Sequence, residues 1–362
     1  MENFFLGLIM YICTVPAAVI LYVLLYPRNW KKKARIFGVN NRPEFLEEMS
    51  AEHIDGIVRS HHRQATVMLV CTLVITTALL FVPVLTVKMI AWTIFVYVFL
   101  LAFAVPYALG NSEIKKYKKV LGIVSEKVLY ADLKNAGNIH ALNVSGLAAA
   151  NLVGLILFVL AVLCDVELLP LKAAMNPGTF LSTGFAGMFF FTSLVLAPIA
   201  VLIDRSKNQI ISENSDINAN YNRARKKVFG DYTIALTWVN NAAALITLLI
   251  LIRVRSEAAT LVILTLYLLA IMLFTGKLVK DIIAVEKRYV NGEAKLLEDD
   301  DDHWILGMFY YNPGDMHLNV PKRAGVGMTI NMAHPAGKAI TVISILVILG
   351  SLISLIGSVI LW

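Results

Sequence analysis

The sequence predicts an all-α polytopic membrane protein with about eight transmembrane helices and a small cytoplasmic β-meander before the last helix. Hydrophobic residues make up 58% of the 362 residues and charged residues 16%, and the mean hydropathy is +0.71. Soluble domains are closer to half apolar and a quarter charged. Several stretches reach the roughly 20 apolar residues that cross a bilayer, whereas the segment before the last of them alternates with the period of strands.

The expected spans are residues 4–26, 65–87, 89–109, 143–164, 180–203, 232–252, 258–276 and 339–361. Composition divides the chain into three parts. Residues 1–297 hold the first seven spans with cytoplasmic helical extensions, 298–337 an acidic linker and a three-stranded β module, and 338–362 the last span.

The distribution of charge predicts the topology. Only Met1-Glu2-Asn3 precedes the first span, whereas Arg28 and a lysine cluster follow it, which is the reverse of a cleaved signal peptide. Of the 32 Lys and Arg residues, 28 lie in four connections, 27–64, 110–142, 204–231 and 277–338. The positive-inside rule makes these connections cytoplasmic, so we expect a plasma-membrane protein with both termini extracytoplasmic. Topology also explains the net charge of +7, which therefore indicates the lipid bilayer as partner and no nucleic acid.

The cytoplasmic connections are expected to extend the helices beyond the bilayer. Ser50 is a candidate cap for a helix that runs into the second span, and Ser215 for one that runs into the sixth. The third and seventh spans are expected to continue into the basic stretches at 115–119 and 277–288.

The segment between the last two spans predicts three strands. Residues 304–311 are rich in aromatic and apolar side chains, and 316–320 and 326–332 alternate between apolar and polar, which is typical of a sheet with one buried face. The turn Asn312-Pro313-Gly314-Asp315 favours a type II turn with Gly314 at positive φ. Lys322 and Arg323 fall at the second turn, where they are expected to pair with Asp301 and Asp302 or with lipid phosphate.

This segment resembles the C-terminal signature of an uncharacterised family of bacterial multi-pass membrane proteins. The matching residues are Asp301, Asp302, Trp304, Gly307, Phe309, Tyr310, Asn312, Pro313, Asp315, Val320, Lys322, Arg323, Gly325, Gly327 and Asn331. A second match is Arg35-Ile36-Phe37-Gly38-Val39, which follows the first membrane helix in relatives too. Some relatives resemble toxin-immunity and signalling membrane proteins with an extracytoplasmic His motif, whereas residues 165–178 here contain no His. The resemblance implies a membrane location and no catalytic residues.

Three amides lie inside the spans. Asn151 falls in the fourth span, and Asn240 and Asn241 lie near the middle of the sixth. Such groups usually hydrogen-bond between helices, and the alternative is that they line a polar path. No Asp, Glu, Lys, Arg or His falls in the central part of any expected span, which disfavours ion-coupled transport because coupled carriers usually need such groups.

The acidic run at 298–302 has two interpretations. Carboxylates bind hard cations such as Ca²⁺, but consecutive acids cannot all face one ion. We therefore favour a solvated linker that keeps the β module away from the anionic inner leaflet. No catalytic motif, metal-ligand spacing or cofactor fingerprint occurs in the sequence, so an enzyme has no positive support, and no cofactor or metal is expected.

Two functions remain open from the sequence. The first is a sensor, accessory or immunity-type membrane protein whose cytoplasmic module docks a protein partner. The alternative is a permease or lipid-handling carrier for an apolar or amphipathic substrate, which the spans and their amides would serve. The sequence leaves the ligand and the oligomeric state open.

Overall fold

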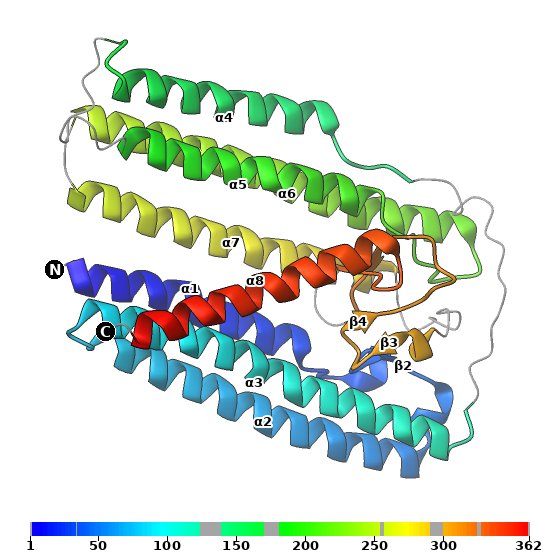
Figure 1. Cartoon of the computed structure of the whole chain (residues 1–362). Coiled ribbons are helices and arrows are strands. Elements are labelled where there is room, and N and C mark those ends of the chain that lie inside the picture. Colours follow the sequence, from blue (N-terminus) through cyan, green and yellow to red (C-terminus); the bar gives the residue numbers. More distant parts are fainter. Residues whose placement is uncertain are drawn as a thin grey trace. The chain divides into compact units, whose positions relative to one another are not determined.

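A computed structural model describes residues 2–33, 35–123, 139–169, 181–253, 257–289, 300–323 and 327–360. The helices in these ranges are α1 (Glu2–Leu25), α2 (Glu48–Leu80), α3 (Leu85–Val120), α4 (Val144–Asp165), α5 (Leu181–Asp204), α6 (Ser215–Arg253), α7 (Glu257–Tyr289) and α8 (Pro335–Ile360). Figure 1 shows them in chain order from blue to red. Three short 3₁₀ turns, η1 (Trp30–Lys32), η2 (Pro43–Leu46) and η3 (Asp301–His303), lie between them.

Helices α1 to α7 each contain a stretch long and apolar enough to cross a membrane, and α8 contributes a shorter apolar stretch, Pro335–Ser351, among the residues searched. A bilayer core of about 30 Å needs about 20 helical residues. The chain is therefore an all-α multi-pass membrane protein with small β elements before its last helix, as the sequence predicts.

The helix boundaries differ from the expected spans at two places. The second span was expected to end at 87, but α2 ends at Leu80 and α3 begins at Leu85, because Pro83 interrupts the backbone hydrogen bonding. The expected caps are also wrong. Ser50 lies inside α2 and accepts a hydrogen bond from Tyr117, and Asn214, one residue before Ser215, accepts the backbone N–H of Asp216 at the start of α6. The predicted continuations beyond the third and seventh spans are confirmed.

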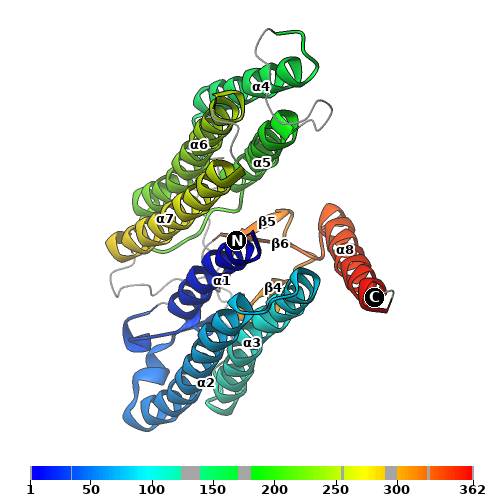
Figure 2. The ribbon, with the colours of Figure 1, turned by 90° about the vertical axis from the view of Figure 1, so that its left-hand side faces the viewer.

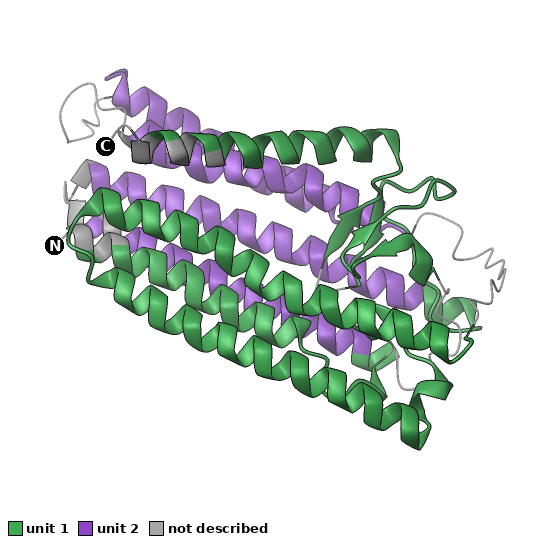
Figure 3. Cartoon of the chain, turned by 60° about the horizontal axis from the view of Figure 1, so that its bottom comes forward, with its two compact units in different colours: residues 1–137, 206–218, 287–362 green, residues 138–205, 219–286 purple. Residues whose placement is uncertain are grey.

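The chain forms two compact units (Figure 3). Unit 1 contains residues 1–137, 206–218 and 287–362, and unit 2 contains 138–205 and 219–286. Composition suggested breaks after 297 and 337, whereas the contacts group the segment before α8 with the first three helices. The segment before α8 thus belongs to the same compact unit as α1, α2 and α3, although it lies near the other end of the sequence.

In unit 1, α1, α2 and α3 run side by side (Figures 1 and 2). Within the bundle, Phe95, Phe99 and Phe103 of α3 stack along one face and pack with Ala18 of α1. Their spacing of four residues places them on one stripe of the helix. Beyond the apolar stretch, a second core forms around Trp30, Phe37, Phe45, Ile54 and Ile114.

Unit 2 contains α4, α5, α7 and most of α6. Helices α4 and α5 are neighbours, and Phe189 of α5 packs edge-on against Tyr267 of α7 at 4.8 Å between ring centres. Buried alanines fill the contacts of α6 with its neighbours, including Ala243 and Ala244. Small residues let membrane helices approach closely.

The expected three-stranded meander is wrong in its details. The structure has three two-stranded antiparallel sheets: β1 (Arg35–Ile36) with β2 (Val39–Asn40), β3 (Trp304–Ile305) with β4 (Phe309–Tyr310), and β5 (Asn319–Pro321) with β6 (Met328–Ile330). The stretch expected to be one strand, 304–311, folds back on itself at Leu306 and Gly307, which have positive φ. A single parallel bridge between Tyr310 and Asn331 links the last two sheets.

The turn at 312–315 also differs from the prediction. Gly314 does not have positive φ, and a Cβ added there would meet Asn312 at 3.4 Å, an ordinary contact. The turn is instead closed by Asn312, whose side-chain oxygen accepts the Gly314 N–H at 2.9 Å. Its carbonyl accepts the Asp315 N–H at 3.3 Å. An Asx turn of this kind needs no left-handed residue.

Candidate functional site

One face of α3 holds the β1–β2 and β3–β4 hairpins of unit 1 in place. Tyr107, Asn111, Lys115 and Lys118 follow each other at helical spacing, so they form one stripe. Asn111 is 1% exposed and donates to the carbonyl of Phe37 at 2.7 Å. Lys115 donates to the carbonyls of Asp301 and Trp304 at 2.7 and 2.6 Å. The stripe thus binds backbone of the β1–β2 hairpin and of the β3–β4 hairpin with the turn before it.

The tips of these two hairpins touch each other. Phe37 and Gly38 have φ of 47° and 80°, and Leu306 and Gly307 have φ of 55° and 68°. A Cβ on Gly38 would lie 3.1 Å from the Gly307 carbonyl oxygen, and one on Gly307 would lie 2.7 Å from the Phe37 carbonyl oxygen. Glycine is required at both positions because the backbones meet there and because the conformation is left-handed.

A buried ionic cluster lies beside this junction. Asp301 is 2% exposed and accepts from Lys118 at 2.8 Å and from the Asn40 backbone N–H at 3.2 and 3.3 Å. Arg323 donates to the same carboxylate and to the Gly38 carbonyl at 2.6 Å. We call Lys118, Asp301 and Arg323 the latch, because together they join α3, the first hairpin and the segment before α8.

The latch is charge-balanced by a second carboxylate. Arg323 also pairs with Asp300, and its guanidinium lies 5.1 Å from the ring centre of Trp304. The Trp304 indole N–H donates to Asp300 at 3.1 Å. Two carboxylates therefore face two cations, and the aromatic ring lies against the guanidinium. In such a site an arginine binds better than a lysine, because its planar guanidinium pairs with carboxylates and packs on aromatic rings.

The electrostatics favour the charged form of Asp301. Burial alone would raise its pKa, but the Arg323 charge and the Lys118 hydrogen bond outweigh burial and lower the pKa to about 2. Burial would likewise lower the pKa of Arg323, and the two carboxylates raise it instead. Asp301 and Arg323 are thus both ionised at neutral pH, and removal of either leaves the other as a buried charge without its main partner.

Asp315 forms a second polar centre in unit 1. It pairs with Lys207 at 3.2 Å, accepts from the Tyr310 hydroxyl at 3.0 Å and from the His317 backbone N–H at 3.0 Å. Burial would raise the Asp315 pKa, but the hydrogen bonds from His317 and the Lys207 charge lower it well below its usual range. Because Lys207 follows α5, this centre ties the connection between α5 and α6 to the segment before α8.

Asn331 fastens the end of that segment. It is fully buried, donates to the carbonyls of Asn312 and Asp315 at 2.9 Å each, and accepts the Asn312 N–H at 3.1 Å. Asn312 in turn donates to the Tyr310 hydroxyl at 3.0 Å. Residues 300–334, which we call the module, therefore form a hydrogen-bonded unit around Trp304, Tyr310 and Val320.

The remaining predicted module residues have different environments. Asp302, Pro313, Gly314 and Lys322 are exposed, and Gly327 is half-buried with φ of 115°. The expected partnership of Asp302 with Lys322 or Arg323 is wrong in this structure, since Arg323 pairs with Asp300 and Asp301. Gly325 lies outside the described residues.

The acidic run is not a solvated linker over its described part. Asp301 is buried in the latch and Asp300 contacts Arg323, so only Asp302 of the three is exposed. Residues 298 and 299 lie outside the described ranges. Within those ranges, no group of three or more His, Cys, Asp or Glu side chains is arranged to hold a metal ion.

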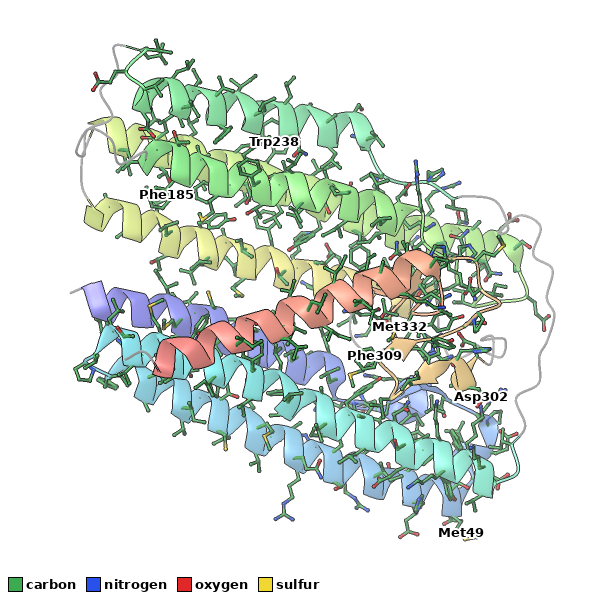
Figure 4. The ribbon with its side chains drawn as sticks, viewed as in Figure 1. Met49, Phe185, Trp238, Asp302, Phe309 and Met332 are labelled. Carbon is green, nitrogen blue, oxygen red and sulfur yellow. The ribbon has the colours of Figure 1, made fainter. Side chains whose placement is uncertain are left out.

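The module has one buried face and one exposed apolar face. In β3 and β4, Trp304 pairs with Tyr310 and Ile305 pairs with Phe309. The first pair is 3% and 1% exposed, whereas the second is 49% and 48% exposed. Tyr311 and Met316, which follow in the chain, are also exposed, and Figure 4 labels Phe309. We call Ile305, Phe309, Tyr311 and Met316 the apolar face.

The three intramembrane amides bond within unit 2. Asn240 donates to Ser193 at 2.7 Å and accepts from Tyr267 at 2.8 Å, so it joins α6 to α5 and α7. Asn241 donates to the Ala150 carbonyl of α4 at 2.8 Å. Asn151 donates to the Leu147 carbonyl in its own helix at 3.0 Å. The interhelix bonds of Asn240 and Asn241 are what the packing interpretation expects, whereas the bond of Asn151 stays within α4.

Sequence reasoning missed the α3 stripe and the contact between the hairpins. The spacing of Tyr107, Asn111 and Lys115 was a usable signal, because polar groups recurring at helical spacing mark one face. The parallel phrases Ile36-Phe37-Gly38 and Ile305-Leu306-Gly307 were another. A glycine inside an apparent strand indicates a bulge or a close approach of backbone, and Gly307 marks both a turn and such an approach.

Residues 313–338 match the model of DUF5808, a family of unknown function. The matched stretch begins in the Asn312–Asp315 turn, contains β5, β6 and Arg323, and ends in the first turn of α8. No curated protein and no solved structure matches the chain. The similarity therefore covers the second half of the module, including the arginine of the latch and Asn331.

Proposed function

We propose that the chain is a plasma-membrane sensor, accessory or immunity-type protein whose module docks a cytoplasmic protein. The observation that carries this proposal is the apolar face. Ile305 and Phe309 are cross-strand neighbours, half exposed, on a hairpin that three side-chain hydrogen bonds from α3, made to the hairpin and to the turn before it, hold in place. Rigidly held, exposed apolar surface marks interaction sites.

The chemistry next to the apolar face favours a protein over the bilayer as occupant. Asp302 is exposed one turn before the hairpin, and Asp300 flanks it. The inner leaflet carries negative potential, which repels carboxylates and attracts Lys and Arg. A partner with an apolar centre and a basic rim is complementary to this surface, since interface cores are apolar and their rims polar.

The proposal includes the topology expected from charge, with the module in the cytoplasm and both termini outside. The alternative of a permease or lipid-handling carrier drew on the amides of α4 and α6. Because Asn240 already uses both ends of its amide in bonds to other helices, the geometry favours docking over transport.

In-cell photo-crosslinking tests docking. A photoreactive amino acid at Phe309 is expected to give a discrete protein adduct, whereas the same group at Met49, which is 82% exposed on α2 (Figure 4), gives none. Adding Arg323→Met, which dismantles the latch, is expected to abolish the Phe309 adduct while insertion is retained. Lipid adducts alone at Phe309, or a protein adduct of equal yield from Met49, would refute docking by the module.

A further inference from the structure

An open groove of 590 Å³ lies between the chain that leaves α1 and the first half of α2. Its lining contains Arg28, Lys31, Lys32 and Arg59 and one carboxylate, Asp55. The groove is built entirely from unit 1 and lies apart from the latch and from the apolar face of the module. Docking by the module does not involve these charges.

The backbone under these cations is fixed. Trp30 is 3% exposed, and its indole N–H donates to Asp55 at 2.6 Å. The side chain of Asn41 donates to the carbonyls of Trp30 and Lys33 at 3.1 and 2.8 Å. The 3₁₀ turn of Trp30–Lys32 is thus tied to α2 and to the first hairpin, so the cations project from a preformed wall.

The groove has more positive charge than its own carboxylate can balance. Asp55 is shared between Trp30 and Lys31, which lies 3.6 Å away. Arg28, Lys32 and Arg59 are exposed and make no ion pair within the described residues. A site with clustered, uncompensated Arg and Lys around an open volume is complementary to phosphate.

The groove borders the apolar part of α1. Arg28 follows Leu25, the last residue of α1, by three positions, and Tyr26 lines the groove. The Tyr26 ring stacks on His62 of α2 at 4.3 Å between ring centres, and the Tyr22 hydroxyl bonds to the same His at 3.1 Å. Aromatic residues of this kind mark the level of lipid headgroups in membrane proteins.

From these observations we propose that the groove binds the phosphate-bearing headgroup of an anionic phospholipid from the adjacent leaflet. The backbone fixed at Trp30 forms the wall of the groove, and Arg28, Lys32 and Arg59 supply its positive charge. Tyr26 and His62 lie beside the groove at the expected level of the lipid headgroups. Because the acyl chains of a bound lipid would remain in the bilayer beside α1, a lipid reaches this site without leaving the membrane. The proposal does not depend on docking by the module.

A charge-matched pair of variants tests the site in the full-length protein in zwitterionic nanodiscs. Lys32→Gln with Arg59→Gln removes two groove charges, one from η1 and one from α2. Lys119→Gln with Arg63→Gln removes two exposed charges outside the groove, one from α3 and one from α2. Phosphatidylglycerol is titrated in and the bound fraction is measured by native mass spectrometry. A charge that lies against the bound headgroup contributes about a fivefold factor to binding, so the groove variant, which loses two such charges, is expected to bind roughly 30-fold more weakly.

The control variant is expected to bind within about threefold of the unmodified protein. Charges that do not touch the bound headgroup are screened by salt, so each of them contributes little to the binding free energy. Equal losses in the two variants, or no loss in the groove variant, would overturn the proposal. Inorganic phosphate that binds in the groove and displaces phosphatidylglycerol at equal concentration would assign the site to a free anion and overturn the lipid as occupant. Unchanged protease protection of residues 300–323 verifies that both variants are folded.

Discussion

At the residue scale, Arg323 shows how one side chain can connect three parts of a chain. It contacts Asp300, Asp301, the carbonyl of Gly38 and the ring of Trp304. Buried ion pairs add little net stability because desolvation offsets attraction, yet breaking one is costly. The latch is therefore best understood as a determinant of which hairpins meet, more than as a source of stability.

Arg323→Met is expected to destabilise the module by about 3–5 kcal/mol, because it leaves the buried Asp301 and the half-buried Asp300 without their main partner. Limited proteolysis of residues 300–334 in detergent measures the change. The neighbouring Lys322→Met is the control, since Lys322 is exposed and surface substitutions usually change stability by less than about 0.5 kcal/mol. Equal protection of the two variants would mean that the latch does not hold the module.

Two glycines of the module are expected to differ in how much their substitution by alanine lowers the stability of the protein. At Gly307, with φ of 68°, the added Cβ would lie 2.7 Å from the Phe37 carbonyl oxygen, so Gly307→Ala should cost about 2 kcal/mol or more from strain and displacement. At Gly314 the nearest atom is 3.4 Å away, so Gly314→Ala should be tolerated within about 1 kcal/mol. Thermal unfolding of both variants measures this, and the reverse order would refute the described hairpin contact.

At the element scale, α3 has two roles along its length. Its first part packs phenylalanines against α1, and its last turns present the Tyr107–Lys118 stripe to the hairpins. A helix that continues past the bilayer carries its orientation with it, so the stripe places the hairpins at a fixed angle to the membrane span. This is why the extension of the third span is part of the candidate site.

The pH dependence of the module follows from Asp301. Its pKa is lowered from an ordinary value of 3.8 to about 2, so the native charge adds stability that is fully present above about pH 4 and is lost as pH falls from 4 toward 2. Hydrogen exchange of residues 300–323, corrected for the intrinsic rate, is expected to show this loss. Asp301→Asn should be less protected at pH 7 and less pH-sensitive between 4 and 2. The same slope in both proteins would assign the loss to other groups.

In unit 2, the amides of Asn240 and Asn241 connect α6 to its neighbouring helices. Asn240→Leu removes two interhelix bonds, each worth about 0.6 kcal/mol on average in membrane proteins, and leaves Ser193 and Tyr267 without that partner. A fall in free energy of unfolding of about 1–2 kcal/mol is expected, with normal insertion and an unchanged cellular phenotype. Loss of phenotype at full stability would instead favour a polar path through the amides.

At the scale of the whole molecule, the basic connections set the expected orientation. Met49 lies before the second span and Leu168 after the fourth, and they are 82% and 72% exposed. In a background without Cys13, Cys71 and Cys164, a cysteine at Leu168 should react with an impermeant thiol reagent in intact cells, and one at Met49 should react only after permeabilisation. Labelling of Met49→Cys in sealed cells would overturn the proposed topology and, with it, a cytoplasmic module.

The sequence by itself determined the class of this protein, because the length and apolarity of the spans and the ends of the extended helices depend on local composition. It also located the module and placed Arg323 opposite an acidic partner. Only the tertiary structure decided that Gly307 is a turn, that Gly314 is not at positive φ, and that Asp301 is buried rather than solvated. The turn at Gly307 and the burial of Asp301 depend on contacts between distant segments, such as that of Arg323 with Gly38, which lie 285 residues apart. Local periodicity carries no information about such pairings, because a short apolar run with a central glycine fits a strand and a hairpin equally well until a partner surface selects one.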